Sequence, residues 1–168
     1  NLAKKLHHSV NLCLLPLHDL PSANAITKSV FNYLNARVPS YFIDKQTVMA
    51  QGFGSANKIE EESKSLIQWL SNLEAQHEYL FFQAEKEATW WTQKCLREAD
   101  HILLLADATQ PFDLQEIEQK INKLADVKVS LALLHSEDTI MPRHTEQWLE
   151  KRPFVSQHFH LKKNDAGG

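Results

Sequence analysis

Glycine is scarce in this chain: only four of its 168 residues are glycine, and two of these are the last two residues. A loop that wraps a phosphate, or that holds a serine in a strained turn, needs glycines at fixed spacings, because other residues adopt those backbone conformations at a cost. The internal glycines, Gly52 and Gly54, precede Ser55, which does not match the Gly-x-Ser-x-Gly spacing of a nucleophile elbow. We therefore predict that this domain is not an enzyme and holds no cofactor.

Three further shortages narrow the class of protein. The chain has two cysteines, Cys13 and Cys95, both inside apolar segments, which favours buried thiols in a reducing, cytoplasmic compartment over a disulfide framework. Its net charge of -3 supplies no strong field to attract nucleic acid or an anionic membrane, so we expect neither as a partner. No apolar run approaches a bilayer span and no secretion signal is visible, so we expect no membrane insertion by this domain.

Short apolar segments alternate with amphipathic segments along the chain. Strands are predicted at residues 10–17, 40–43, 79–83, 101–106, 127–134 and 157–161, the last at a sheet edge. Helices are predicted at residues 25–37, 58–76, 88–99 and 142–151. One more helix is predicted to begin at Pro111, and its apolar side chains recur at helical spacing through Leu124. This order predicts a three-layer, doubly wound α/β fold with a mainly parallel sheet. We expect a single domain over residues 1–163 and a polar tail over residues 164–168.

Ligands in such folds bind at the carboxyl ends of the strands, and the loop after the first strand is where a phosphate loop would lie. Lys28 and Ser29 stand in the place of a Gly-Lys-Ser ending, but Ser22 and Thr27 replace the two glycines. A β-branched threonine cannot supply the conformations of glycine at low cost. We therefore expect no working phosphate loop; the simpler interpretation is that Ser22 or Asn24 caps a helix and that Lys28 is solvated.

Nine histidines raise the question of a metal site. His158 and His160 would point to one face of a strand, yet no cysteine or carboxylate stands beside them at a ligand spacing, so no metal site is predicted. The alternative is that these two rings stack at a sheet edge or bond to a neighbouring loop. A helical period places Trp91 and Cys95 on one buried face and leaves Trp90 elsewhere, as a candidate contact residue.

The most specific motifs are Thr-Trp-Trp-Thr at 89–92, Cys-Leu-Arg-Glu-Ala-Asp at 95–100, Pro-Arg-His-Thr-Glu-Gln-Trp-Leu at 142–149 and His-Phe-His at 158–160. Together they resemble a region of the neuropathy target esterase family of patatin-like phospholipases. In that family the region lies between the cyclic-nucleotide-binding domains and the patatin domain, which holds the catalytic residues. Glu98 stands where a glutamine is common, and residues 40–67 match no motif.

The resemblance implies a Rossmann-like domain related to the P-loop NTPases that has lost its phosphate loop. The implied function is a non-catalytic regulatory or scaffolding domain that links the cyclic-nucleotide-binding and lipase domains of a serine phospholipase or lysophospholipase, a hydrolase of lipid metabolism. Membrane association of that parent protein is a further expectation from the resemblance. Trp90, His158 and His160 are then the candidate interface residues. The alternative is a nucleotide-responsive module in which Ser22, Thr27, Lys28 and Ser29 form a degenerate phosphate-binding loop.

Overall fold

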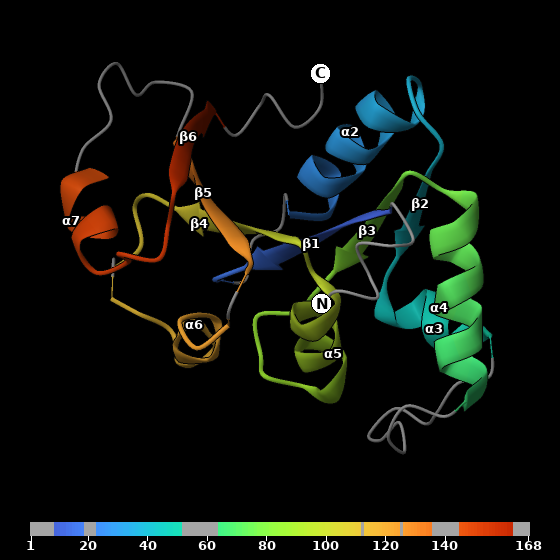
Figure 1. Ribbon diagram of the computed structural model, residues 1–168. Helices are drawn as coiled ribbons and strands as arrows, with labels where there is room; N and C mark the ends of the chain where they lie inside the picture. The colour runs from blue at the N-terminus through green and yellow to red at the C-terminus, as the bar shows by residue number, and fades with distance from the viewer. Residues whose placement is uncertain are drawn as a thin grey trace.

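The computed structural model describes residues 9–18, 23–51, 64–111, 113–124, 126–135 and 145–162. These residues build one six-stranded sheet in the order β2-β3-β1-β4-β5-β6, and all five strand pairings are parallel (Figure 1). The predicted α/β fold with a parallel sheet is confirmed, and each strand end lies within one residue of its predicted position. The strands are β1 (Val10–Pro16), β2 (Ser40–Ile43), β3 (Tyr79–Gln83), β4 (His101–Asp107), β5 (Lys128–His135) and β6 (Gln157–Lys162).

Within the described residues, six helices connect or flank these strands. They are α2 (Ala23–Asn35), α3 (Lys45–Ala50), α4 (Lys64–Gln76), α5 (Trp90–Glu98), α6 (Glu116–Ile121) and α7 (Thr145–Glu150). The predicted starts of α4 and α7, the loop at 52–57, Ser22 and the polar tail lie outside the described residues. None of the described helices is long and apolar enough to span a membrane.

Two predictions about the helices were wrong. Helix α3 was not predicted, because Val48 is its single buried residue and leaves no apolar stripe to detect; its start is set by Asp44, whose carboxylate accepts the Thr47 N–H (2.7 Å). The helix expected from Pro111 begins only at Glu116, because the Glu118 carboxylate accepts the Gln115 N–H (2.9 Å) and so caps the chain at that point.

The strand order decides which face of the sheet each helix covers. Parallel crossovers are almost always right-handed, so the direction in which a connection moves across the sheet fixes the face on which its helix lies. The β1-to-β2 connection moves one way, and the four later connections all move the other way. Accordingly α2 lies alone on one side of the sheet and α3, α4, α5 and α6 lie on the other, in the part of the chain that the structure describes (Figure 1).

We call the two sides the covered face and the open face. The covered face bears one alternate set of strand side chains, Cys13 and Leu104 among them, which pack with α3 to α7 into the main hydrophobic core. Trp91 of α5 and Trp148 of α7 are fully buried in this core, as expected for anchors of the covering helices. On the open face, Ile26 of α2 packs with a much smaller apolar cluster, formed by Leu105, Ala132 and Leu134.

Candidate functional site at the carboxyl edge of the sheet

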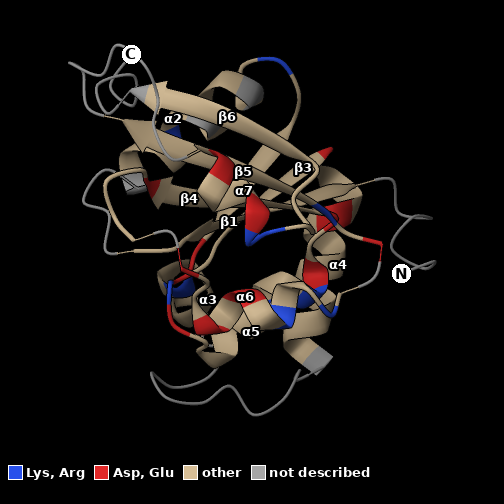
Figure 2. Cartoon of the chain, turned by 90° about the vertical axis from the view of Figure 1, so that its left-hand side faces the viewer, with Lys and Arg blue, Asp and Glu red and all other residues tan. Residues whose placement is uncertain are grey.

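The carboxyl ends of the parallel strands meet at one edge, as predicted, and the polar residues at this edge are the candidate functional site. His18 follows β1, Gln83 ends β3, Asp107 ends β4 and His135 ends β5. His160 lies beside β5, because its register partner is Leu133. The charged groups are spread over the surface rather than gathered in one field (Figure 2).

The β3 part of this edge is used to hold α5 in place. The Gln83 side-chain amide donates to the Ala84 carbonyl oxygen (3.0 Å), and the Trp91 indole N–H donates to the Gln83 carbonyl oxygen (2.8 Å). The Thr92 hydroxyl accepts the Glu85 N–H (3.0 Å) and donates to the Glu85 carbonyl oxygen (3.1 Å). Backbone groups that a ligand might otherwise meet at the end of β3 are therefore bonded to the neighbouring helix.

The described residues of the predicted phosphate loop lie inside α2. Unpaired N–H groups occur in the first turn of a helix, whereas Thr27, Lys28 and Ser29 come after the first four residues of α2. Thr27 is fully buried and Lys28 is exposed, so the two side chains point in different directions, about 100° apart around the helix. The structure therefore does not gather these three side chains around the start of α2, and Ser22 lies outside the described residues.

The β5 and β6 part of the edge carries a histidine cluster. His135 Nε2 lies 2.8 Å from His160 Nδ1, and the His158 ring lies 5.5 Å from the His160 ring, edge to face. One imidazole must donate a proton to the other, so the contact is lost when both rings are protonated. Burial lowers the pKa of His135 and of His160, and for His160 the neighbouring histidines lower it further. The His135 and His160 rings are thus neutral hydrogen-bonding groups near pH 7.

Asp107 lies between this cluster and His18. Its carboxylate accepts both the Thr109 N–H (2.8 Å) and the Thr109 hydroxyl (2.6 Å), which closes the turn after β4. Burial lowers the pKa of His18, and the Asp107 charge opposes that shift at His18 as it does at His135. Among the residues that the structure describes, no three side chains of metal-binding type converge.

The predicted interface residues lie in two different places. His158 and His160 are exposed on β6, which is an edge strand as predicted. Trp90 is partly buried and packs against the main core, with its ring 5.9 Å from that of Trp91. The thiols of Cys13 and Cys95 are both free and fully buried, and burial together with a hydrogen bond between them raises the pKa of Cys95.

Sequence reasoning missed a buried ion pair between Arg152 and Glu118. Arg152 Nη2 donates to Glu118 Oε1 (2.9 Å), and Arg152 Nε lies 2.7 Å from Glu118 Oε2, so one hydrogen bond and one close ionic contact join the two side chains. Both side chains are fully buried, and the guanidinium lies 4.6 Å above the Trp148 ring. The detectable signal was a charge at 118 inside the apolar stripe of α6, next to Ile117.

The chain matches known proteins over almost its whole length. The family described as the Neuropathy Target Esterase family P-loop like domain matches residues 10–166. Patatin-like phospholipase domain-containing protein 7 of Mus musculus is 37% identical over 148 residues, which are 88% of this chain and 11% of that protein. Patatin-like phospholipase domain-containing protein 6 of Homo sapiens is 31% identical over 153 residues, 90% of this chain and 11% of that protein. The chain thus spans about a tenth of the length of the curated relatives it matches.

Solved structures with the same fold include a plasmid partition protein and a protein described as an ATP complex. A plasmid partition protein from Borrelia burgdorferi has a TM-score of 0.65 at 9% identity and covers 93% of this chain and 91% of its own. A Cyanothece McdA–ATP complex has a TM-score of 0.60 at 14% identity and covers 93% of this chain and 84% of its own. At such low identity the likeness establishes the fold alone, which is that of P-loop NTPase-like proteins. From the family match and the two relatives, this chain belongs to the Neuropathy Target Esterase family P-loop like domain.

Proposed function

We propose that this domain is a non-catalytic regulatory or scaffolding unit of a patatin-like phospholipase or lysophospholipase, and that it links cyclic-nucleotide-binding domains to the lipase domain. The observation that carries this proposal is how the carboxyl edge is built. Side chains there bond to backbone groups and to one another: Gln83 to Ala84, Asp107 to Thr109, and His135 to His160. An edge made this way holds helices and strands in fixed positions, and a fixed geometry is what a linking domain contributes.

Two further features support this role. The relatives are about nine times longer than the matched segment, which leaves room in the parent polypeptide for both neighbouring domains. The free, buried thiols of Cys13 and Cys95 suit a reducing compartment, so the parent would work with this domain in the cytoplasm.

The first test is the esterase activity of the purified 168-residue chain toward a lysophospholipid. We expect no turnover above background, because the chain lacks the glycine spacing of a nucleophile elbow. Turnover that a serine-directed phosphonate abolishes would contradict the proposal.

The second test uses the full-length parent protein with Trp91→Ala in this domain. Loss of the buried indole should lower the stability of the domain and, through it, change the esterase rate or its response to cyclic nucleotides, although no catalytic residue is altered. Ile67→Ala is the control, since Ile67 is 44% exposed on α4. Full-length activity that stays unchanged after the domain has demonstrably unfolded would refute the linking role.

The alternative, a nucleotide-responsive module, is favoured by one observation: α2 follows β1 directly and so occupies the position of a phosphate-binding helix. Titration of the chain with ATP or GTP in the presence of magnesium separates the two functions. We expect no micromolar binding. Binding that Lys28→Ala removes, and that Lys120→Ala on the exposed side of α6 leaves intact, would replace the scaffolding proposal with this one.

A further inference from the structure

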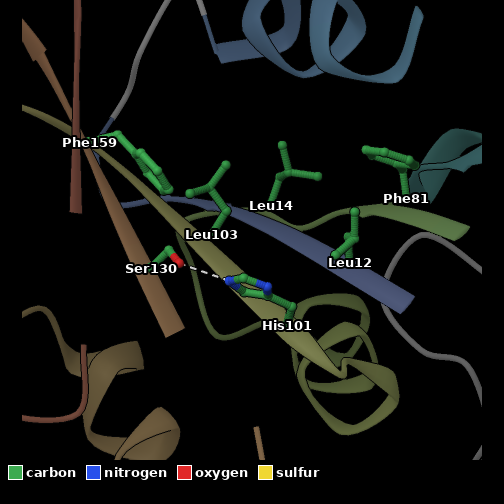
Figure 3. A pocket seen from close by; sticks show the side chains of 7 residues that line it. All are labelled: Leu12, Leu14, Phe81, His101, Leu103, Ser130 and Phe159. Atoms are coloured by element: carbon green, nitrogen blue, oxygen red, sulfur yellow. Dashed lines mark hydrogen bonds between the residues drawn. The ribbon is translucent and has the colours of Figure 1, made fainter. Parts of the chain in front are cut away.

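The open face contains a hollow of about 210 Å³ between α2 and β6. Figure 3 shows α2 at its upper side and Phe159 of β6 at its end, with the strands forming the floor. Apolar side chains from four strands supply most of the lining, and only two of the lining residues are polar. The lining residues are Leu12, Leu14, Phe81, His101, Leu103, Ser130 and Phe159.

The two polar side chains in the floor form a hydrogen bond with each other. His101 Nε2 lies 2.8 Å from Ser130 Oγ. Burial, and then the nearby charge of Lys128, lowers the pKa of His101, so the ring is neutral near pH 7. An apolar side chain can cover this floor without burying an unpaired charge, because both polar groups in the floor are uncharged and hydrogen-bonded.

The course of α2 explains why the hollow exists. At the start of α2, Ile26 packs over the carboxyl-terminal halves of β4 and β5. Further along the helix, the Phe31 ring lies 5.6 Å from that of Phe81 and 5.9 Å from that of Phe42, over β3 and β2. The helix therefore crosses the sheet diagonally and leaves the amino-terminal halves of β1, β4, β5 and β6 outside its cover, whereas Leu161 near the end of β6 packs against the Ile26 cluster.

Large apolar side chains remain in solvent there. Phe159 is 47% exposed and Val10 is 37% exposed, and both lie on this face. All four later crossovers lie on the covered face, so no helix in the described part of the chain covers this area. Contiguous apolar surface of this kind marks a site where another element packs.

We propose that the open face is covered by an amphipathic helix from the rest of the parent polypeptide, which lies beside α2 and places a bulky apolar side chain in the hollow. This inference rests on the proposed linking function and names the surface through which the link is made. About nine tenths of the relatives' length lies outside the matched segment, so chain to form such a helix is available. Helices pack with their axes about 8–10 Å apart, and the uncovered strands are spaced about 4.8 Å apart. One helix therefore fits over them next to α2.

A positive charge at the rim of the hollow predicts an acidic residue on the docking helix. Lys128 is exposed at the amino end of β5 and lies on the open face, because it is the register partner of His101. An acidic residue on the docking helix would face it, and rim charges of this kind set orientation more than affinity.

A second copy of the chain fits this surface poorly. A twofold interface with its axis through the hollow would set hollow against hollow, so neither hollow would be filled. Helix α2 also projects from the same face with an exposed polar side, represented by Lys28, Asn32 and Asn35. For the same reason a flat lipid surface would meet α2 before it reached the recessed hollow.

The test compares the full-length parent protein with the 168-residue chain by hydrogen exchange. Amides of β6 and of the first half of β4 should exchange roughly tenfold more slowly in the full-length protein, because the docked helix must open first. In parallel, Phe159→Glu should lower the melting midpoint of the full-length protein by several degrees and leave that of the chain nearly unchanged. Ile67→Glu is the matched control, since Ile67 is 44% exposed on the outer side of α4.

Several outcomes would overturn the proposal. Equal exchange rates in the two proteins, or equal effects of Phe159→Glu and Ile67→Glu, would mean that the open face stays uncovered. A dimer of the chain that Phe159→Glu dissociates would make a second copy the occupant. Sedimentation of the chain with phosphatidylcholine vesicles, lost in Phe159→Glu, would make a lipid surface the occupant. Failure of the linking function appears separately, as full-length esterase activity that does not respond to unfolding of this domain.

Discussion

Removing either partner of the buried Arg152–Glu118 pair should greatly lower the free energy of unfolding of this domain. Arg152 Nε lies in ionic contact with Glu118 Oε2 (2.7 Å), and Arg152 Nη2 donates to Glu118 Oε1 (2.9 Å). Arg152 Nη1 donates to the Trp148 carbonyl oxygen (3.1 Å). Its Nη2 also donates to the Asp113 carbonyl oxygen (3.3 Å). The guanidinium therefore ties α6, the residues before it and α7 into one unit beneath β4 and β5.

The magnitude follows from the burial of both side chains, which are fully shielded from solvent. Breaking a buried pair by removing one partner costs about 3–5 kcal/mol, because a charge is left uncompensated in a low-dielectric site. Folded domains are stable by only about 5–15 kcal/mol. We therefore expect Arg152→Met and Glu118→Gln each to lose a large fraction of the free energy of unfolding.

The double variant separates charge from packing. Arg152→Met combined with Glu118→Leu removes both charges and fills the space with apolar atoms. Such a replacement often leaves the free energy of unfolding unchanged or raises it. It also loses the bond from Glu118 to the Gln115 N–H, a capping contribution of about 1 kcal/mol. Urea unfolding at neutral pH should therefore rank the double variant well above either single variant. A double variant that loses the sum of the two single losses, or a single variant that loses less than about 1 kcal/mol, would refute this reasoning.

Three further predictions use the same unfolding assay or a simple chemical probe. Trp91→Ala should lower the free energy of unfolding by about 3–5 kcal/mol, because it empties a fully buried site and removes the hydrogen bond to Gln83. A smaller loss than that caused by Trp90→Ala would show that Trp91 does not anchor α5. Burial lowers the pKa of His18, His101, His135 and His160 below the ordinary value of about 6.5, so the unfolded chain takes up protons first and stability should be lost as the pH falls through that value; a urea midpoint that rises on acidification would contradict this sign. Cys13 and Cys95 should react with a thiol reagent only as fast as the domain opens, because both are fully buried and the pKa of Cys95 is raised; fast reaction of the native chain would exclude the packing described.

Strands β1, β3, β4 and β5 were predictable because their apolar runs are nearly continuous and end abruptly at polar residues. Helix α3 was not predictable from periodicity, since it buries only Val48, although Asp44 followed by Thr47 was a capping signal in the sequence. The false start at Pro111 arose because Leu114 extends the apolar stripe of α6, yet that side chain is 42% exposed. Capping bonds, more than apolar spacing, set where the short helices begin.

The candidate site was harder to predict than the fold. The sequence placed His158 and His160 together on β6, but the partner of His160 is His135, which is 25 positions away in the chain and becomes adjacent only through strand register. The Arg152–Glu118 pair is hidden for a similar reason, because its members are 34 positions apart. A charge in an apolar stripe indicates a buried partner, but it cannot identify that partner without the packing of α6 and α7.

The uneven cover of the sheet links the fold to the proposed role. Strand order and handedness place α3 to α7 on one face, so any sequence with this order leaves the opposite face to α2 alone among the elements described here. An independent domain would have to make that face polar, yet Leu12, Leu103 and Phe159 remain apolar there. A domain that functions alone would be expected to carry polar residues at these sites, because exposed apolar surface promotes association. Apolar side chains on a face that the topology itself leaves open are therefore the feature that a domain built to pack against its neighbours requires.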